Sequence, residues 1–395
     1  MYNVAENPKL GYYQVGNKKH YAKTMALMEA TKTNQFPEWN FNRDTFDRVA
    51  WQVEPQTEIT ELYRLRALQL REQYDYIRLE FSGGADSTTV LYSFVHNNIH
   101  LDEVVFRYPK TGEKNATTAD PFNTKCENTL SEWEFAAKPI LQWLAVQRPQ
   151  TKITMHDYSE SMLDAKLDDS WVFRTKDYCQ PGHAFKHDAV SLIDHRRRAD
   201  GGKQICVLYG VDKPKMCIRD QKWYVYFMDF QANHANSVVY EYNNLNIEYF
   251  YWTPDFPELV QKQAHLIRNW FMLPQNKFLQ HLVRWPNHSV TQRTTYEHVV
   301  KPLIYPDYDP ATFQVSKPSN NFYAEMDFWF YQNFQETNAY KNWQAGLQLV
   351  TNNIDAKYFN TELGRPVGFV GFMSPFYCVG SADYVSSGIN DFSKF

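Results

Sequence analysis

Residues 76–91, Tyr-Ile-Arg-Leu-Glu-Phe-Ser-Gly-Gly-Ala-Asp-Ser-Thr-Thr-Val-Leu, constrain the fold more than any other stretch of the chain. In the first six of them, the apolar residues Ile77, Leu79 and Phe81 alternate with polar ones, which is the period of a β-strand. Beyond the glycine pair, apolar residues recur at the spacing of one helix face, namely at Val90, Leu91, Phe94 and Val95. A strand, a glycine turn and a helix in this order predict an α/β protein that presents backbone N–H groups to an anion.

The turn between strand and helix has the chemistry of a phosphate site. Glycines lack the Cβ atoms that would hold an anion away from the backbone, and the start of a helix carries a partial positive charge. Two serines can donate hydroxyl hydrogen bonds, and Asp86 can hold a magnesium ion against the phosphates. We therefore predict that a nucleotide binds to Ser82, Gly83, Gly84, Ala85, Asp86 and Ser87.

The same six residues, Ser-Gly-Gly-Ala-Asp-Ser, resemble the SGGxDS signature of the PP-loop ATP pyrophosphatases. This superfamily includes asparagine synthetase, GMP synthetase, NAD synthetase, tRNA-lysidine synthetase and, more distantly, the phosphoadenosine-phosphosulfate reductases. The resemblance implies an adenine nucleotide alpha-hydrolase-like fold that uses ATP and Mg²⁺. It covers about residues 74–215, and only the six-residue loop matches tightly. The GxxxxGK[ST] loop of γ-phosphate-transferring NTPases does not occur in the sequence.

Further strands are predicted at residues 101–108, 153–157 and 204–209, with helical patterns between them. Alternating strands and helices favour a parallel, Rossmann-like sheet, whose ligands lie at the carboxyl ends of the strands. We therefore expect Arg107 to contact the nucleotide, and the stretches that follow the other strands, including Asp157, to converge on the same crevice.

A second charged loop, Tyr209-Gly-Val-Asp-Lys-Pro-Lys215, follows the last of these strands. We predict that Gly210 and Asp212 bind the nucleotide, with Asp212 as a second magnesium ligand. Lys213 and Lys215 are predicted to neutralise charge on the leaving pyrophosphate, which makes them catalytic together with Asp86. The alternative is an ordinary charged surface loop.

Cys179, His183 and His187 lie close together in the sequence. We expect the two histidines to contact the substrate. The alternatives are surface histidines without a role, or a zinc site, for which these three side chains would not complete the four ligands of a structural centre.

With 395 residues, the chain is long for one domain. We divide it into an N-terminal helical segment that packs on the sheet (1–74), an ATP-binding domain (75–217) and a mainly helical, aromatic-rich C-terminal domain that is expected to bind the acceptor (218–395). Helices are expected at residues 22–31, 57–73, 128–147, 258–271, 277–284, 323–335 and 338–349. We interpret the aromatic residues of the last region as core rather than as a base-binding surface.

A net charge of −4 argues against a broad electrostatic footprint for nucleic acid. Five scattered cysteines without CxxC spacing are typical of reduced thiols. The sequence shows no signal-peptide pattern at its start and no apolar run of membrane-spanning length. The second residue is Tyr2, so no amidotransferase domain that begins with a catalytic cysteine is expected. Together these features predict a cytoplasmic protein that does not bind membranes.

The function that we expect is ATP-dependent adenylation. ATP would be split into AMP and pyrophosphate to activate a carbonyl or carboxylate, which a nitrogen or sulfur nucleophile then attacks. The acceptor is expected to be a small molecule or a nucleic-acid base. The alternatives are a reductase of the phosphoadenosine-phosphosulfate type and a nucleotide-binding interaction module without catalysis. Against the reductase, the last cysteine, Cys378, lacks the sequence context of a reductase cysteine.

Overall fold

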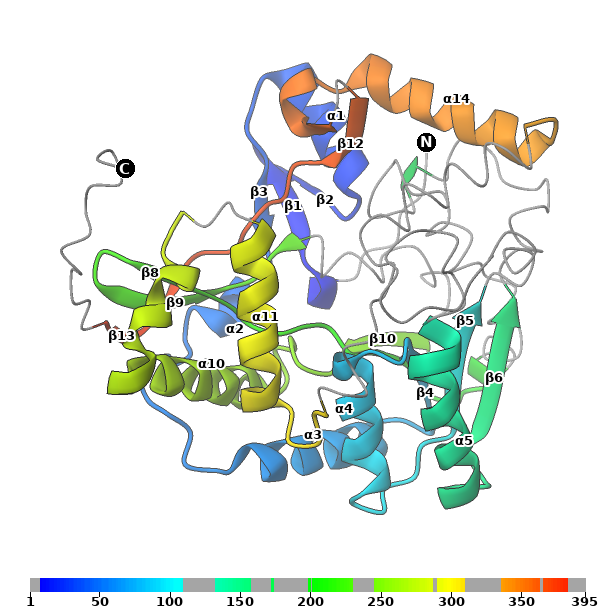
Figure 1. Cartoon of the computed structure of the whole chain (residues 1–395). Coiled ribbons are helices and arrows are strands. Elements are labelled where there is room, and N and C mark those ends of the chain that lie inside the picture. Colours follow the sequence, from blue (N-terminus) through cyan, green and yellow to red (C-terminus); the bar gives the residue numbers. More distant parts are fainter. Residues whose placement is uncertain are drawn as a thin grey trace.

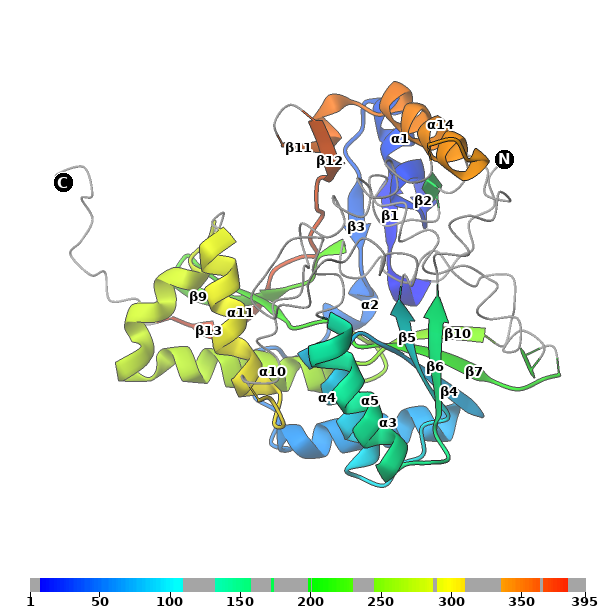
Figure 2. The same ribbon diagram turned by 45° about the vertical axis from the view of Figure 1, so that its right-hand side comes forward.

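The structure is a computed structural model. It describes residues 8–108, 132–157, 172–173, 198–199, 201–229, 245–286, 290–309, 335–362 and 365–382. Figure 1 and Figure 2 show the chain in two orientations.

A five-stranded parallel sheet organises the described part of the chain. Its order is β10-β7-β4-β5-β6, where the strands are β4 (Tyr76–Phe81), β5 (Glu103–Tyr108), β6 (Lys152–Asp157), β7 (Ile205–Tyr209) and β10 (Leu245–Tyr249). The predicted α/β class with a parallel, Rossmann-like sheet is therefore confirmed. The first four strands match the predicted ones to within two residues, whereas β10 was not predicted.

Helices α3 (Ile59–Gln73), α4 (Ala85–Val95) and α5 (Lys138–Gln147) lie on the same side of this sheet in both views (Figures 1 and 2). α3 and α4 contact each other, and both contact β4. Helix α4 is buried along nearly its whole length, and it contacts both β4 and α3. A π-helical turn, η4 (Glu132–Ala137), leads into α5, so the helix expected over residues 128–147 is confirmed where the chain is described.

The segment that precedes β4 contains strands as well as the expected helices. β1, β2 and β3 form an antiparallel sheet in the order β2-β1-β3. The elements of the segment are η1 (Pro8–Leu10), β1 (Tyr12–Val15), β2 (Lys18–His20), α1 (Lys23–Thr33), β3 (Glu38–Asn40) and α2 (Arg43–Phe46). Strands of three or four residues carry too few apolar positions for a period of two to be recognised in the sequence.

The region beyond residue 217 also mixes strands with helices. β8, β9 and β13 form an antiparallel sheet in the order β13-β9-β8. The elements are β8 (Lys215–Arg219), β9 (Lys222–Tyr226), α10 (Pro257–Met272), η8 (Pro274–Val283), α11 (Val290–Ile304), α14 (Asn338–Asn353), η9 (Ala356–Tyr358), β11 (Phe359–Glu362), β12 (Arg365–Phe369) and β13 (Tyr377–Ser381). No helix of the described ranges is long and apolar enough to cross a membrane.

The predicted boundary at residue 217 falls inside β8, and the chain beyond it returns to the central sheet. β10 pairs in parallel with β7, from Leu245 opposite Ile205 to Tyr249 opposite Tyr209. The ladder contacts continue past the strands, because the Phe250 N–H donates to the Tyr209 carbonyl at 2.9 Å. The region that was expected to form a separate helical domain thus supplies an edge strand of the parallel sheet.

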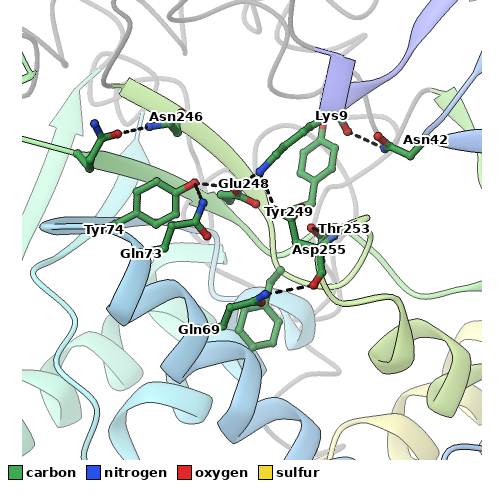
Figure 3. Close-up of polar contacts among 12 residues, drawn as sticks. Lys9, Asn42, Gln69, Gln73, Tyr74, Asn246, Glu248, Tyr249, Thr253 and Asp255 are labelled. Atoms are coloured by element: carbon green, nitrogen blue, oxygen red, sulfur yellow. Dashed lines mark hydrogen bonds and ion pairs between the residues drawn. The ribbon is translucent and has the colours of Figure 1, made fainter. Parts of the chain in front are cut away.

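A buried carboxylate attaches β10 to the N-terminal segment (Figure 3). Glu248 is 2% exposed and accepts hydrogen bonds from Lys9 Nζ at 3.0 Å, Arg66 Nη2 at 3.1 Å and Tyr74 OH at 2.6 Å. Lys9 also pairs with Asp255 at 2.6 Å. A buried carboxylate is tolerated when cations and hydrogen-bond donors surround it. These contacts hold η1, α3 and β10 together.

Aromatic rings from the segment before β4 and from the region beyond residue 217 meet in the core. The Phe227 ring centroid lies 5.1 Å from that of Phe41, 4.7 Å from that of Phe46 and 5.0 Å from that of Trp252. All four side chains are fully buried. The aromatic residues at 223, 227 and 249–252 therefore belong to the core, as predicted, and residues before β4 share that core with them.

Candidate functional site

The strand order reverses between β4 and β7. β5 and β6 follow on one side of β4, whereas β7 and β10 lie on its other side. In open parallel sheets, ligands bind at the carboxyl ends of the two strands that flank such a reversal. The two loops selected from the sequence, residues 82–87 and 210–215, follow β4 and β7, so both start at this position.

The loop at residues 82–87 is braced by its own serines. The Ser82 N–H donates to Ser87 Oγ at 3.2 Å, and Ser87 Oγ donates to the Gly84 carbonyl at 3.2 Å. The two hydroxyl oxygens lie 3.3 Å apart. Gly84 is the N-cap residue of α4, so the N-cap position supplies no side-chain acceptor, and the Gly84 N–H donates to Ser82 Oγ at 3.4 Å. The first N–H groups of α4 can therefore serve an anion without competition from an N-cap side chain.

Two glycines permit close packing around the loop. Gly83 has a φ of +72°, and a Cβ atom on it would lie 2.8 Å from the backbone nitrogen of Ala137. A Cβ atom on Gly210 would lie 3.1 Å from the carbonyl carbon of Asp86 and from the Cα atom of Ser87. The second loop therefore lies against the first turn of α4, and the residue types at both contacts are required by the geometry.

Gly83→Ala should destabilise the protein more than Gly202→Ala does. Both glycines have a positive φ, +72° and +85°, but a Cβ atom on Gly202 would meet nothing within 4 Å. The Gly202 variant thus isolates the backbone strain, about 1–2 kcal/mol. The Gly83 variant adds overlap with the backbone of Ala137, about 1–3 kcal/mol more. Urea unfolding of both variants measures the difference, and equal losses would contradict the close approach.

An alternating cluster of charges joins the two loops. Lys213 Nζ lies 3.0 Å from Asp86 Oδ1, 3.1 Å from Asp86 Oδ2 and 3.0 Å from Asp212 Oδ1. Lys215 Nζ lies 3.1 Å from Asp212 Oδ2. Lys213 is 5% exposed, so its ammonium group is held almost entirely by these carboxylates. The structure brings together the four charged residues predicted from the two loops, and the cluster has no net charge.

Electrostatic attraction within the cluster keeps Asp212 and Lys213 ionised. Burial opposes the charge on Asp212, but Lys213 and Lys215 outweigh it and hold the pKa of this carboxyl below its usual range. Burial likewise disfavours the charge on Lys213, but Asp212 and Asp86 raise the pKa of its ammonium well above the ordinary value. At neutral pH Lys213 is therefore a permanent cation between two carboxylates.

Three buried tyrosines surround Asp86, and sequence reasoning missed them as site residues. Tyr305 OH donates to Asp86 Oδ1. Tyr251 OH donates to the Asp86 backbone carbonyl at 2.8 Å. Tyr63 OH donates to the carbonyl of Ile304 at 2.5 Å. Burial, followed by the nearby Asp86 charge, raises the pKa of Tyr305, which therefore stays protonated and acts as a donor. A tyrosine more than 200 residues from the loop gives no local pattern that could have identified it.

Arg107, which was predicted to contact the nucleotide, is engaged across the sheet. Its Nε donates to Glu80 Oε2 at 2.7 Å, and its Nη2 donates to Glu80 Oε1 at 3.0 Å. Its Nη1 lies 3.2 Å from His156 Nδ1. This bidentate pair uses two of the five guanidinium N–H groups, so the contact of Arg107 with a nucleotide stays a prediction. His183 and His187, which were predicted to contact the substrate, lie outside the described residues, as do Cys179 and the side chain of Asp157.

Asp86 and Asp212 carry carboxylates, the ligand type that Mg²⁺ prefers. Both contact one cation, Lys213 Nζ, so a metal ion bound by both carboxylates would have to take the place of this ammonium group. Mg²⁺ commonly takes one or two carboxylates and fills its other positions with water and phosphate oxygens. In the described ranges, no three His, Cys, Asp or Glu side chains gather into a metal cluster, so phosphate oxygens and water would have to complete the coordination.

No family model matches this chain, and no curated protein matches its sequence.

Proposed function

We propose that the protein is an ATP-dependent adenylating enzyme of the PP-loop pyrophosphatase type, with an adenine nucleotide alpha-hydrolase-like domain. The observation that carries the proposal is the contact of Lys213 with Asp86 across the two loops that flank the strand-order reversal. An uncapped helix start, two carboxylates and two lysines at that position match the needs of a triphosphate with its metal ion.

In the proposed reaction, an oxygen of the acceptor attacks the α-phosphorus of ATP. The bond from this phosphorus to the oxygen that bridges the α and β phosphates breaks, and pyrophosphate leaves with the electron pair. The acceptor is then bonded to AMP, which a nitrogen or sulfur nucleophile displaces. Since the glycine loop and the start of α4 would hold the β and γ phosphates, the α-phosphorus stays accessible to the acceptor.

Each charged residue has a proposed role. Lys213 and Lys215 stabilise negative charge as it builds up on pyrophosphate, which lowers the barrier to its departure. Asp86 and Asp212 would hold Mg²⁺, which supplies charge neutralisation to the phosphates when bound. His183 and His187 remain proposed substrate contacts, and the C-terminal region is proposed to select the acceptor. A cytoplasmic location is part of the same proposal.

Product analysis tests the proposal. The protein is incubated with ATP, Mg²⁺, ammonia or sulfide as the nucleophile and a panel of carboxylate and nucleobase acceptors, without inorganic pyrophosphatase, and the nucleotides are separated by chromatography. We expect AMP and pyrophosphate in equal amounts. ADP as the sole nucleotide product would contradict adenylation. Binding of ATP without consumption would favour an interaction module, and thiol-dependent release of sulfite from phosphoadenosine phosphosulfate would favour a reductase.

A further inference from the structure

The carboxylate of Asp86 accepts hydrogen bonds from two donors, one charged and one neutral. Lys213 contacts both of its carboxylate oxygens, at 3.0 and 3.1 Å, whereas Tyr305 donates to Oδ1. The ammonium group neutralises the carboxylate, but the hydroxyl group leaves its negative charge in place. If Lys213 turns to the phosphates, as the proposed function requires, Asp86 loses its ionic partner and keeps its neutral one.

Tyr305 is held firmly at the end of α11. It is 1% exposed, and its N–H donates to the Lys301 carbonyl at 2.9 Å. Its ring centroid lies 5.8 Å from that of Tyr251. The preceding carbonyl, of Ile304, accepts from Tyr63. The hydroxyl group of Tyr305 is therefore held in one place, and its hydrogen bond to Asp86 orients the carboxylate of that residue.

Helix α11 also contacts the second loop. Tyr296 is 7% exposed, and its hydroxyl donates to the Pro214 carbonyl at 3.1 Å. Helix α11 thus places Tyr296 against residues 210–215. Tyr305, the residue directly after the helix, donates to Asp86. The relative position of the two loops is fixed by α11 as well as by the Lys213 ion pairs.

We infer that Tyr305 is a positioning residue for a nucleotide-bound divalent cation. By holding Oδ1 of Asp86 with a neutral donor, Tyr305 keeps the carboxylate in one rotamer, with Oδ2 available to the cation once Lys213 has turned away. The inference rests on the proposed function, because it assumes that a metal–nucleotide complex binds here. Donors that orient a metal-binding carboxylate typically change metal affinity by about 10–100-fold.

Manganese binding measured by electron paramagnetic resonance tests this role without turnover. Wild-type protein and Tyr305→Phe are titrated with Mn²⁺ in the presence of α,β-methylene-ATP, and the affinity for the metal-free analogue is measured separately. We expect Tyr305→Phe to weaken Mn²⁺ binding about tenfold or more and to leave the affinity for the metal-free analogue unchanged. Equal Mn²⁺ affinities would overturn the inference.

Tyr74→Phe is the matched control. It also removes a buried tyrosine hydroxyl group that donates to a carboxylate, but the carboxylate is that of Glu248 rather than Asp86. We expect wild-type Mn²⁺ affinity in this variant, and an equal weakening would show that the effect is not specific to Tyr305. In an Asp86→Asn background, Tyr305→Phe should have no further effect on Mn²⁺ binding. An additional loss there would also overturn the inference.

Failure of the proposed function gives a different result. If wild-type protein binds neither the analogue nor Mn²⁺ with it, the nucleotide site itself is wrong, whatever Tyr305 does. Circular dichroism checks the fold of each variant. Should Tyr305→Phe not fold, 4-fluorophenylalanine at position 305 fills the volume of the hydroxyl group without a donor, and the same tenfold weakening is expected of it.

Discussion

Asp86→Asn should abolish ATP-dependent turnover and leave the fold intact. Asparagine keeps the shape of the side chain and an oxygen that can accept from Tyr305, but it removes the charge that faces Lys213. Since even residues that only orient a metal ligand change affinity by about 10–100-fold, loss of a proposed ligand should lower kcat by more than about a hundredfold. AMP formation measures the effect, with circular dichroism as the check on folding.

Ser87→Ala is the comparison within the same loop. Its hydroxyl group braces Ser82 and Gly84 and is proposed to donate to phosphate, so its loss should weaken nucleotide binding by about 1–3 kcal/mol. Asp86→Asn should therefore act mainly on kcat, and Ser87→Ala mainly on the affinity for ATP. An Asp86→Asn variant with full activity, or one that unfolds, would show that Asp86 does not act through a metal ion.

The centre of the fold could be predicted because its signals are local. In residues 76–81, apolar side chains alternate with polar ones, and two glycines and a helical pattern follow. Strand, turn and helix are therefore specified within one stretch of sequence. The ends of parallel strands share one edge of a sheet, so the meeting of residues 82–87 with 210–215 followed from the strand assignments alone. The contact between Lys213 Nζ and Asp86 Oδ1 confirms that the two loops meet.

Features that depend on distant contacts could not be predicted. β10 has the sequence Leu-Asn-Ile-Glu-Tyr, and its Glu248 looks like a surface residue until Lys9, Arg66 and Tyr74 are placed around it. For the same reason, the region beyond residue 217 was expected to be a separate helical domain. Helix α11 contains Pro302, which normally argues against a helix interior, and so Tyr305 at its end was overlooked.

Lys213→Met should lower both stability and turnover. Methionine has a similar length but no charge, so Asp86 and Asp212 would face each other without the ammonium group between them. Removal of one partner from a buried ion pair typically destabilises a protein by about 3–5 kcal/mol. Turnover should fall through kcat more than through the KM for ATP, because Lys213 is proposed to act on charge that develops as pyrophosphate leaves.

Lys215→Met is the matched control for stability, because Asp212 would still be paired with Lys213 in that variant. Addition of a divalent cation then distinguishes whether Asp86 and Asp212 serve only as ion-pair partners of Lys213 or also bind a metal ion. In Lys213→Met, the position between the two carboxylates no longer holds a cation, so Mg²⁺ or Mn²⁺ should bind there and raise the unfolding temperature more than it does in wild type or in Lys215→Met. This measurement needs neither ATP nor an acceptor. A metal-induced shift that is the same in all three proteins would mean that Asp86 and Asp212 form a pair for Lys213 alone, and the magnesium site would have to lie elsewhere.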